Sequence, residues 1–461
     1  MAVRALLPLA AVALFLAAGS GLAELLPNLR RKPLVRRLAY AYLLGVAWVA
    51  GGLWALSHFA AVPLRRPAIL ALAAAPVLAG AVSYLWRRGW SRRRRPRLPW
   101  RLRLLIFLAA AVGGFLALGL FAEALTNPPT DWDGRMTWSA QARYLRAAGT
   151  VDAEILQRKR WYVDHPRYPP LLPLAQAAAM ELLGSGEDAA VYRPLYAAFF
   201  PVFLLLAYDG ARRWVGRRPA AWTALAAAVV PFLSLDREGG AAGEYSDLPL
   251  ACFYGAALLL LLKARPRAAD GIAAGLLLGA ALLTKNEGVL LAGFALAIAF
   301  GTILWRRRSA RTGRRLAPVA LAALLALAAF ALLASWRAGI PNRFDEEYAK
   351  RLADLWPAAW ERLPLLVPPI LGKMIAWRDW TLFWWMLPVI FLAGRRGLVR
   401  GVSLPLAAAA AAPLAIGWGA YLVHWNPVYL ISVTWNRLLL QGSVPLLVLL
   451  AMALAGCLPR E

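Results

Sequence analysis

The stretch "GEYSDLPLACFYGAALLLLLKARPR", residues 243–267, consists of a short acidic segment, an apolar run and a basic segment. A helix of about 20 mostly apolar residues crosses the hydrocarbon core of a membrane, and this run approaches that length. Acids precede the run and bases follow it, so the two ends of the helix differ in charge. This asymmetry indicates a membrane span whose basic end faces the cytoplasm.

The same pattern recurs along all 461 residues, of which 61% are hydrophobic. We therefore predict an all-α polytopic membrane protein with about 13 transmembrane helices. The predicted spans are 5–26, 38–60, 68–86, 104–125, 191–211, 219–235, 248–264, 270–284, 288–305, 316–336, 378–394, 402–422 and 437–456.

The connecting loops differ in charge, and this difference predicts the topology. Six of them, including "RRGWSRRRRPRLPWRLR" and "RRRSARTGRR", hold 30 basic residues and no acid, while the alternate loops hold most of the 24 acids. Basic loops stay in the cytoplasm, so we place the acidic loops and the amino terminus outside the cell inner membrane. We expect the first apolar run to be an uncleaved anchor rather than a signal peptide.

Two apolar stretches, 168–184 and 363–377, are long enough to suggest further spans. If either crossed the membrane, every later basic loop would face outside. We therefore expect both to be helices at the outer interface. They belong to two large outer loops, 126–190 and 337–377, and the chain divides into 1–103 with three spans, 104–305, and 306–461 with the remaining spans.

The formal net charge of +28 alone excludes few classes of protein function. Nucleic-acid binding is not expected, because the basic residues lie in short loops between spans rather than in a soluble domain. The two cysteines, Cys252 and Cys457, both lie in apolar runs and show no disulfide or metal-binding spacing.

Charged residues collect at the predicted outer face. The segment "NPPTDWDGRMTW", residues 127–138, places Asp131 and Asp133 at the end of a span. Charges at membrane depth usually face a bundle interior or an aqueous cavity. The other charged or polar residues that we place there are Arg237, Glu244, Asp247, Lys285, Glu287, His165, Arg167, Tyr168 and Arg437.

These residue types suit one kind of reaction. A carboxylate can take a proton from an acceptor hydroxyl, and lysine or arginine can hold a phosphate that leaves. Large outer loops with interfacial helices suit a substrate with a tail in the bilayer. Glycosyl transfer from a lipid-phosphate sugar needs all three features.

The ordered set "TDWDGRMTWSAQARYL", "RYPPLLPLAQA", "GEYSDLPLA", "LLTKNEG" and "NRLLLQGSVP" resembles the membrane-embedded GT-C glycosyltransferases. This class includes the protein O-mannosyltransferases and the aminoarabinose transferases. The resemblance is best over residues 104–305, which it identifies as the catalytic module. It implies the GT-C fold, a polyprenyl-phosphate sugar donor and a glycan, lipid or protein acceptor.

The resemblance also implies roles. The catalytic base falls on Asp133 or Asp131, with Asp133 favoured by its "WD" position. Lys285 would contact the donor phosphate, with Arg437 and Arg237 as further contacts. The segment "TKNEG" departs from the family's "TKG" by adding Glu287. The substrate would meet Glu244, Asp247, Glu287, His165, Arg167 and Tyr168.

Simpler interpretations stay open. Asp131, Asp133 and Asp247 suit helix capping, and Lys285 and Arg437 suit snorkelling from helix ends. The four carboxylates Asp131, Asp133, Glu244 and Asp247 also suit an oxygen cage for Mg²⁺ or Mn²⁺. A transporter or flippase of a lipid-linked sugar, or a glycan ligase, would use the same outer charges.

Overall fold

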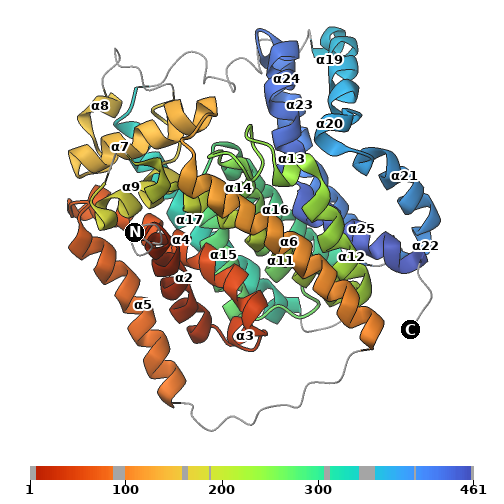
Figure 1. The fold of residues 1–461 in the computed structure, drawn as a ribbon, viewed down its shortest axis with the longest axis horizontal. Coiled ribbons are helices and arrows are strands. Elements are labelled where there is room, and N and C mark those ends of the chain that lie inside the picture. The colour runs from red at the N-terminus through yellow and green to blue at the C-terminus, as the bar shows by residue number, and fades with distance from the viewer. Residues whose placement is uncertain are drawn as a thin grey trace.

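The apolar runs form helices because a backbone in hydrocarbon must satisfy its hydrogen bonds within the segment. The computed structural model describes residues 7–86, 99–157, 165–185, 188–305, 312–341, 359–398 and 401–457, and every regular element in these ranges is a helix (Figure 1). The centres of two predicted basic loops, 87–98 and 306–311, lie outside the described residues. So do the parts 158–164 and 342–358 of the two predicted outer loops.

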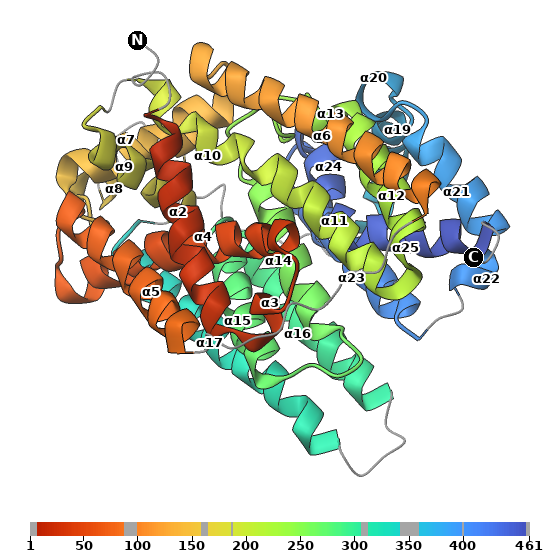
Figure 2. The same ribbon diagram turned by 60° about the horizontal axis from the view of Figure 1, so that its bottom comes forward.

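The amino-terminal helices are part of the bundle. Their bounds are α2 (Leu9–Leu25), α3 (Pro27–Arg30), α4 (Leu34–Ala60) and α5 (Arg66–Trp86). Helices α2 and α4 lie side by side with their backbones in contact (Figure 2). A Cβ atom on Gly45 would lie 1.7 Å from the carbonyl oxygen of Phe15, so only glycine permits this approach.

The next segment leads from α6 into the first outer loop. Its elements are α6 (Trp100–Thr126), the π-helix η1 (Asp133–Trp138), α7 (Ser139–Ala148), α8 (Glu154–Gln157), α9 (Leu171–Leu183), η2 (Ala189–Val191) and α10 (Arg193–Ala197). The predicted helix at 168–184 is confirmed as α9, which packs on α4 and α7 and has only 13 residues. It is too short to cross a membrane alone.

The centre of the molecule is built from α11 (Phe199–Val215), α12 (Arg217–Val229), α13 (Pro231–Ser234), α14 (Asp247–Leu261), α15 (Ala268–Leu282), α16 (Glu287–Trp305) and α17 (Thr312–Ala338). All fifteen residues of α14 are buried. Helix α4 packs against α11 and α15, so the amino-terminal segment covers this centre. Figure 1 shows α6 lying across α11 and α12.

The carboxyl-terminal helices are α19 (Ala359–Met374), α20 (Trp377–Trp380), α21 (Phe383–Ala393), α22 (Arg395–Leu398), α23 (Ser403–Val423), α24 (Pro427–Gln441) and α25 (Ser443–Cys457). The second predicted interfacial helix falls in α19. Helices α24 and α25 meet at an angle of 58°. Helix α24 packs against α14, and Arg437 and Gln441 at its carboxyl end contact Asp247.

The chain is a polytopic membrane protein, although the number of spans differs from the prediction. Among the described residues, seven helices are long and apolar enough to cross a membrane, or eight if α24 and α25 count as one span. Every one of the 13 predicted ranges contains helix. Helices α2, α12, α14, α15 and α21 are shorter than this test requires, so the higher number stays a prediction.

Candidate active site

The site is organised around one buried carboxylate. Asp247 is the first residue of α14 and is 0% exposed. It accepts hydrogen bonds from Lys285 Nζ at 2.8 Å and Arg437 Nε at 2.8 Å. Gln441 Nε2 donates a third, at 2.7 Å. The side chain therefore joins three separate segments instead of only capping its own helix.

Arg437 connects this carboxylate with the first outer loop. Its Nη2 atom lies 3.0 Å from Asp133 Oδ2, and its guanidinium stacks over the ring of Tyr245. The Arg437 side chain is 11% exposed, so it does not snorkel into water. The guanidinium thus lies between two carboxylates, Asp133 and Asp247.

The two aspartates of the first outer loop have different surroundings. Asp131 is 6% exposed, and its Oδ2 accepts a hydrogen bond of 2.9 Å from the backbone N–H of Gly134. It therefore caps the start of η1, as the simpler interpretation predicted. Asp133 is the first residue of η1, and its side chain is 26% exposed. Asp133 is thus the aspartate of the pair with more access to solvent.

Glu244 lies on the other side of Asp131. Its carboxylate is buried and forms an ion pair with Arg193, whose Nη2 also lies 2.7 Å from Glu123 Oε2. Burial, together with the nearby Asp131 carboxylate, raises the pKa of Glu244 to about 8, and Arg193 opposes this rise. The contact with Arg193 therefore becomes a full ion pair only as the pH rises toward this value.

Lys285 lies in the turn between α15 and α16. Its side chain is 4% exposed and contacts Glu287 Oε1 at 3.1 Å in addition to Asp247. The added glutamate of "TKNEG" therefore binds the neighbouring lysine directly. Because Lys285 is buried and paired with two acids, its ammonium group does not reach toward water as a snorkelling lysine would.

The predicted residues His165, Arg167 and Tyr168 form the border of the site. The Tyr168 ring stacks on His165 and on Trp138, the last residue of η1. The Arg167 carbonyl accepts a hydrogen bond of 3.0 Å from Arg337 Nε. This segment therefore packs against the end of η1 through Tyr168.

Arg237 lies at the outer edge. Its Nη1 donates to Thr130 Oγ1 at 2.8 Å, and its Nη2 lies 3.4 Å from Glu123. Its side chain is 48% exposed. Arg237 thus belongs to the ion-pair cluster of Arg193 rather than to that of Arg437.

The four carboxylates considered for a metal cage do not gather around one point. Asp131 lies with Glu244, whereas Asp133 and Asp247 share Arg437. In the part of the chain that the structure describes, no group of three or more histidine, cysteine or acidic side chains is arranged to hold an ion. The residues present do not fit the predicted Mg²⁺ or Mn²⁺.

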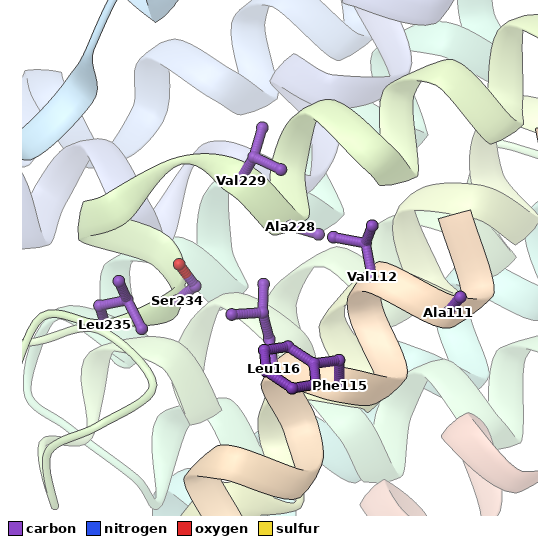
Figure 3. Close-up of a pocket in the computed structure, with 8 residues that line it drawn as sticks. All are labelled: Ala111, Val112, Phe115, Leu116, Ala228, Val229, Ser234 and Leu235. Atoms are coloured by element: carbon purple, nitrogen blue, oxygen red, sulfur yellow. The ribbon is translucent and has the colours of Figure 1, made fainter. Parts of the chain in front are cut away.

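An apolar cavity of about 520 Å³ lies between α6 and the α12–α13 segment (Figure 3). Val112, Leu116 and Ala228 are among the side chains that face it. It is also lined by Leu235, the residue before Asp236 in the outer turn. One end of this apolar cavity therefore lies next to the outer turn that carries Asp236 and Arg237.

Sequence reasoning missed two buried members of the site. Arg193 precedes the apolar residues of α11 in "VYRPLYAAFF" and is 2% exposed. Gln441 is the one polar residue in "LLLQG" and is 0% exposed. A lone arginine or glutamine next to an apolar run is a signal for a buried polar contact, although it does not identify the partner.

Residues 164–336 match the sequence model of the family described as dolichyl-phosphate-mannose-protein mannosyltransferase. Glu244, Asp247, Lys285 and Glu287 lie in this segment, and the match confirms the resemblance drawn from the motifs. The chain is thus a polytopic membrane protein whose segment 164–336 is of this family of membrane glycosyltransferases. No curated protein matches the chain.

Two kinds of solved structure are similar to the chain. ArnT from Cupriavidus metallidurans bound to undecaprenyl phosphate is 20% identical, with a TM-score of 0.47 over 74% of this chain and 59% of that one. The archaeal oligosaccharyltransferase AglB from Archaeoglobus fulgidus, in complex with an inhibitory peptide and a dolichol-phosphate, is 15% identical, with a TM-score of 0.43 over 75% of this chain and 50% of that one. The chain covers between half and three fifths of the length of these proteins.

Proposed function

We propose that the protein is a membrane glycosyltransferase that moves a sugar from a polyprenyl-phosphate donor to an acceptor hydroxyl on the outer face. One observation carries the proposal: a partly exposed carboxylate, Asp133, lies 3.0 Å from Arg437, and Asp247 links Arg437 to Lys285. A base and two cations thus meet at one end of the bundle. The family match over 164–336 supports the same class of reaction.

The donor phosphate binds Lys285 and Arg437. Lys285 has three N–H donors and directs two contacts to Asp247 and Glu287, which leaves capacity for a phosphate oxygen. The guanidinium of Arg437 has five N–H donors and can contact phosphate while it keeps its bond to Asp247. Asp247 therefore positions both cations and does not react.

Donor binding also releases the base. Asp133 is paired with Arg437 in this structure, and a phosphate at Arg437 competes for the same guanidinium. The freed Asp133 carboxylate then takes the proton of the acceptor hydroxyl. The acceptor oxygen bonds to the anomeric carbon as the bond from that carbon to the phosphate oxygen breaks. Polyprenyl phosphate leaves, and the single displacement inverts the sugar carbon.

The other predicted residues position η1 or border the paths by which the donor and the acceptor reach the site. Asp131 and the protonated Glu244 hold the start of η1, and Arg237 lies at the edge that the donor phosphate would pass. His165, Arg167 and Tyr168 border the acceptor side. The lipid tail of the donor suits the cavity of Figure 3, which is apolar and approaches Asp236 and Arg237.

The proposal includes a topology. The chain adopts a GT-C arrangement with 13 spans in the cell inner membrane, and the site faces the periplasmic side. The charge difference between alternate loops supports this orientation. The acceptor is a glycan, a lipid or a protein.

The test is radiolabel transfer by the purified protein from short-chain polyprenyl-phosphate sugars, with release of polyprenyl phosphate as the second readout. We expect Asp133→Asn to reduce turnover by a factor of about 100 or more, the usual contribution of a general base. Asp188→Asn is the matched control, because Asp188 is an exposed acid in the same outer loop and asparagine can keep its cap on η2.

Full turnover of Asp133→Asn would remove the proposed base. If Asp131→Asn instead abolishes turnover in a folded protein, the base is Asp131. If wild type gives no turnover with any donor but moves the donor across proteoliposome membranes, the protein is a transporter and the proposed reaction is wrong.

A further inference from the structure

A second cavity lies at the other end of the bundle. It has a volume of about 730 Å³, within the range of ligand pockets, and lies between α6, α11, α12 and the start of α4. It is hollow because the facing residues are small. They include Ala110, Gly113 and Gly114 of α6 and Ala221 and Ala224 of α12.

This cavity is separate from the one in Figure 3. The first is lined by residues 111, 112, 115 and 116 of α6, and the second by residues 109, 110, 113, 114 and 117. With 3.6 residues per turn, these two sets occupy opposite faces of the helix. The two cavities also use opposite ends of α12.

One end of the second cavity is strongly basic. Arg36, Arg212 and Arg217 line it together with Tyr208. Arg36 binds Asp209 at 2.7 Å. For the side chains of Arg212 and Arg217, the described residues provide no ion pair or hydrogen bond. The nearest carboxylate, Asp209, already pairs with Lys32, Arg36 and Arg213, so cations outnumber acids at this end. An excess of guanidinium groups beside an apolar cavity favours a bound anion that carries an apolar tail.

The basic end lies far from the proposed reaction. Arg193 precedes α11 and Arg212 lies near its end, so about 19 residues of largely helical chain, or roughly 28 Å, separate them. The basic end belongs to the loops "NLRRKPLVRR" and "RRWVGRR", which the charge pattern places in the cytoplasm. The cytoplasmic leaflet contains anionic lipids, and basic pockets between spans on that side bind their headgroups.

We propose that this cavity binds a diacyl phospholipid of the cytoplasmic leaflet with an anionic headgroup. The phosphate contacts Arg212 and Arg217, next to the amino-terminal N–H groups of α12, and an acyl chain lies along Gly113 and Gly114. Charge complementarity at one end and the small residues at the other select this class of ligand. The inference does not depend on the proposed reaction, because no residue of the candidate active site lines the cavity.

A bound lipid would also affect α6. The far end of this helix carries Glu123, which pairs with Arg193 and Arg237, and then leads to Asp131 and Asp133. A lipid that fills the gap between α6 and α11 would hold that end in place. We therefore expect phosphatidylglycerol to raise the melting temperature of the purified protein.

The experiment is native mass spectrometry of the purified full chain with added phosphatidylglycerol or phosphatidylcholine. Two variants remove the site in different ways: Gly114→Leu fills the cavity, and Arg212→Gln with Arg217→Gln removes the free charges. A Cβ atom on Gly114 meets nothing within 4 Å, so the substitution does not strain the backbone. We expect either variant to bind phosphatidylglycerol at least about tenfold more weakly.

Each variant has a matched control. Gly119→Leu changes another α6 glycine whose Cβ would meet nothing within 4 Å and which does not line the cavity. Arg265→Gln removes an exposed charge from the same end of the molecule. We expect both controls to bind phosphatidylglycerol as wild type does.

Three results would overturn the proposal. The first is equal binding of phosphatidylcholine and phosphatidylglycerol by wild type, and the second is unchanged binding of phosphatidylglycerol by both site variants. Alternatively, polyprenyl phosphate displaces phosphatidylglycerol at equal concentration and is lost from the same variants, in which case the cavity binds the donor lipid. If Gly114→Leu does not fold, the double arginine variant decides the outcome.

Discussion

Asp247 shows how a carboxylate is tolerated deep in an apolar bundle. Its Oδ1 accepts hydrogen bonds from Lys285 and Gln441 and its Oδ2 accepts one from Arg437, so both oxygens have partners. The arrangement also makes the three donors depend on Asp247 for their positions. Removing one partner of a buried ion pair leaves the others uncompensated, which makes this residue both structural and, in the proposed function, essential.

We therefore expect Asp247→Asn to destabilise the protein and to reduce transfer. Loss of the charge leaves Lys285 and Arg437 buried without it, which typically costs about 3–5 kcal/mol. The checks are the melting temperature in detergent and radiolabel transfer. Asp188→Asn, in an exposed position, should change neither. A fully stable and active Asp247→Asn would show that Lys285 and Arg437 are held in other ways.

Glu244 predicts a pH dependence of stability. Its folded-state pKa is raised to about 8, whereas an unfolded glutamate titrates near about 4.3. Between these values the folded protein binds a proton that the unfolded chain has lost. The stability contribution is therefore complete below about pH 4.3 and decreases as pH rises towards 8. The measurement is the melting temperature from pH 5 to 9, and Glu244→Gln should flatten the slope across this window. An equal slope in the variant would assign it to another group.

The sequence identified the ionic partners of the site but not how they pair. Asp133, Asp247, Lys285 and Arg437 were all predicted from charges at span ends, and the structure brings these four together. The interpretation of Asp131 as a helix cap agrees with its hydrogen bond to Gly134. The interpretations of Asp247 as only a cap and of Lys285 as a snorkelling side chain do not agree with their buried ion pair. Arg193 was missed because a single charge beside an apolar run gives no information about a partner 51 residues away.

At the scale of elements, the two aspartates lie at the start of the π-helix η1, Asp131 just before it and Asp133 as its first residue. One extra residue per turn changes the direction of the side chains, and such turns are frequent at functional sites. Asp131 turns inward to the N–H of Gly134, while Asp133 turns outward to Arg437. The spacing "DWD" agrees with this difference, since side chains two residues apart on a helix do not face each other, but it does not identify their partners.

Gly134 makes this geometry possible, and its replacement is a direct test. A Cβ atom there would lie 2.1 Å from Asp131 Oδ2 and 2.9 Å from Glu244 Cβ. We expect Gly134→Ala to displace the Asp131 carboxylate and lower turnover at least about tenfold with a modest loss of stability. Gly119→Ala is the control, because its Cβ would meet nothing within 4 Å. Unchanged turnover in Gly134→Ala would mean that η1 is not needed in this form.

For the whole molecule, the apolar runs predicted which stretches are helical, whereas the number of 13 spans stays a prediction. Helices occur in all 13 predicted ranges, yet α14 and α15 have only 15 residues each. Charged residues lie at their starts: Asp247 begins α14, and Asp270, the third residue of α15, accepts a hydrogen bond of 2.9 Å from the backbone N–H of Arg267. Length rules treat each run as an isolated helix, whereas these two are enclosed by their neighbours.

The topology can be tested with single cysteines. In a Cys457→Ser background, where the remaining Cys252 is buried, we expect a membrane-impermeant maleimide to label Asp188→Cys in intact spheroplasts. Arg265→Cys should react only after the membrane is opened, because its loop is basic. The reverse pattern would place the candidate active site on the cytoplasmic side.

The long sequence separation between Asp247 and Arg437 has a consequence for synthesis. The two residues are 190 positions apart, so at typical translation rates roughly 10–40 s pass before the ribosome makes the second. During this interval the nascent chain has already delivered an aspartate to the membrane without its arginine. Insertion of α14 therefore depends on a temporary partner, such as Lys285 or an insertase that keeps the segment hydrated. Nascent chains that stop between residues 247 and 437 should be the ones that quality-control proteases recognise.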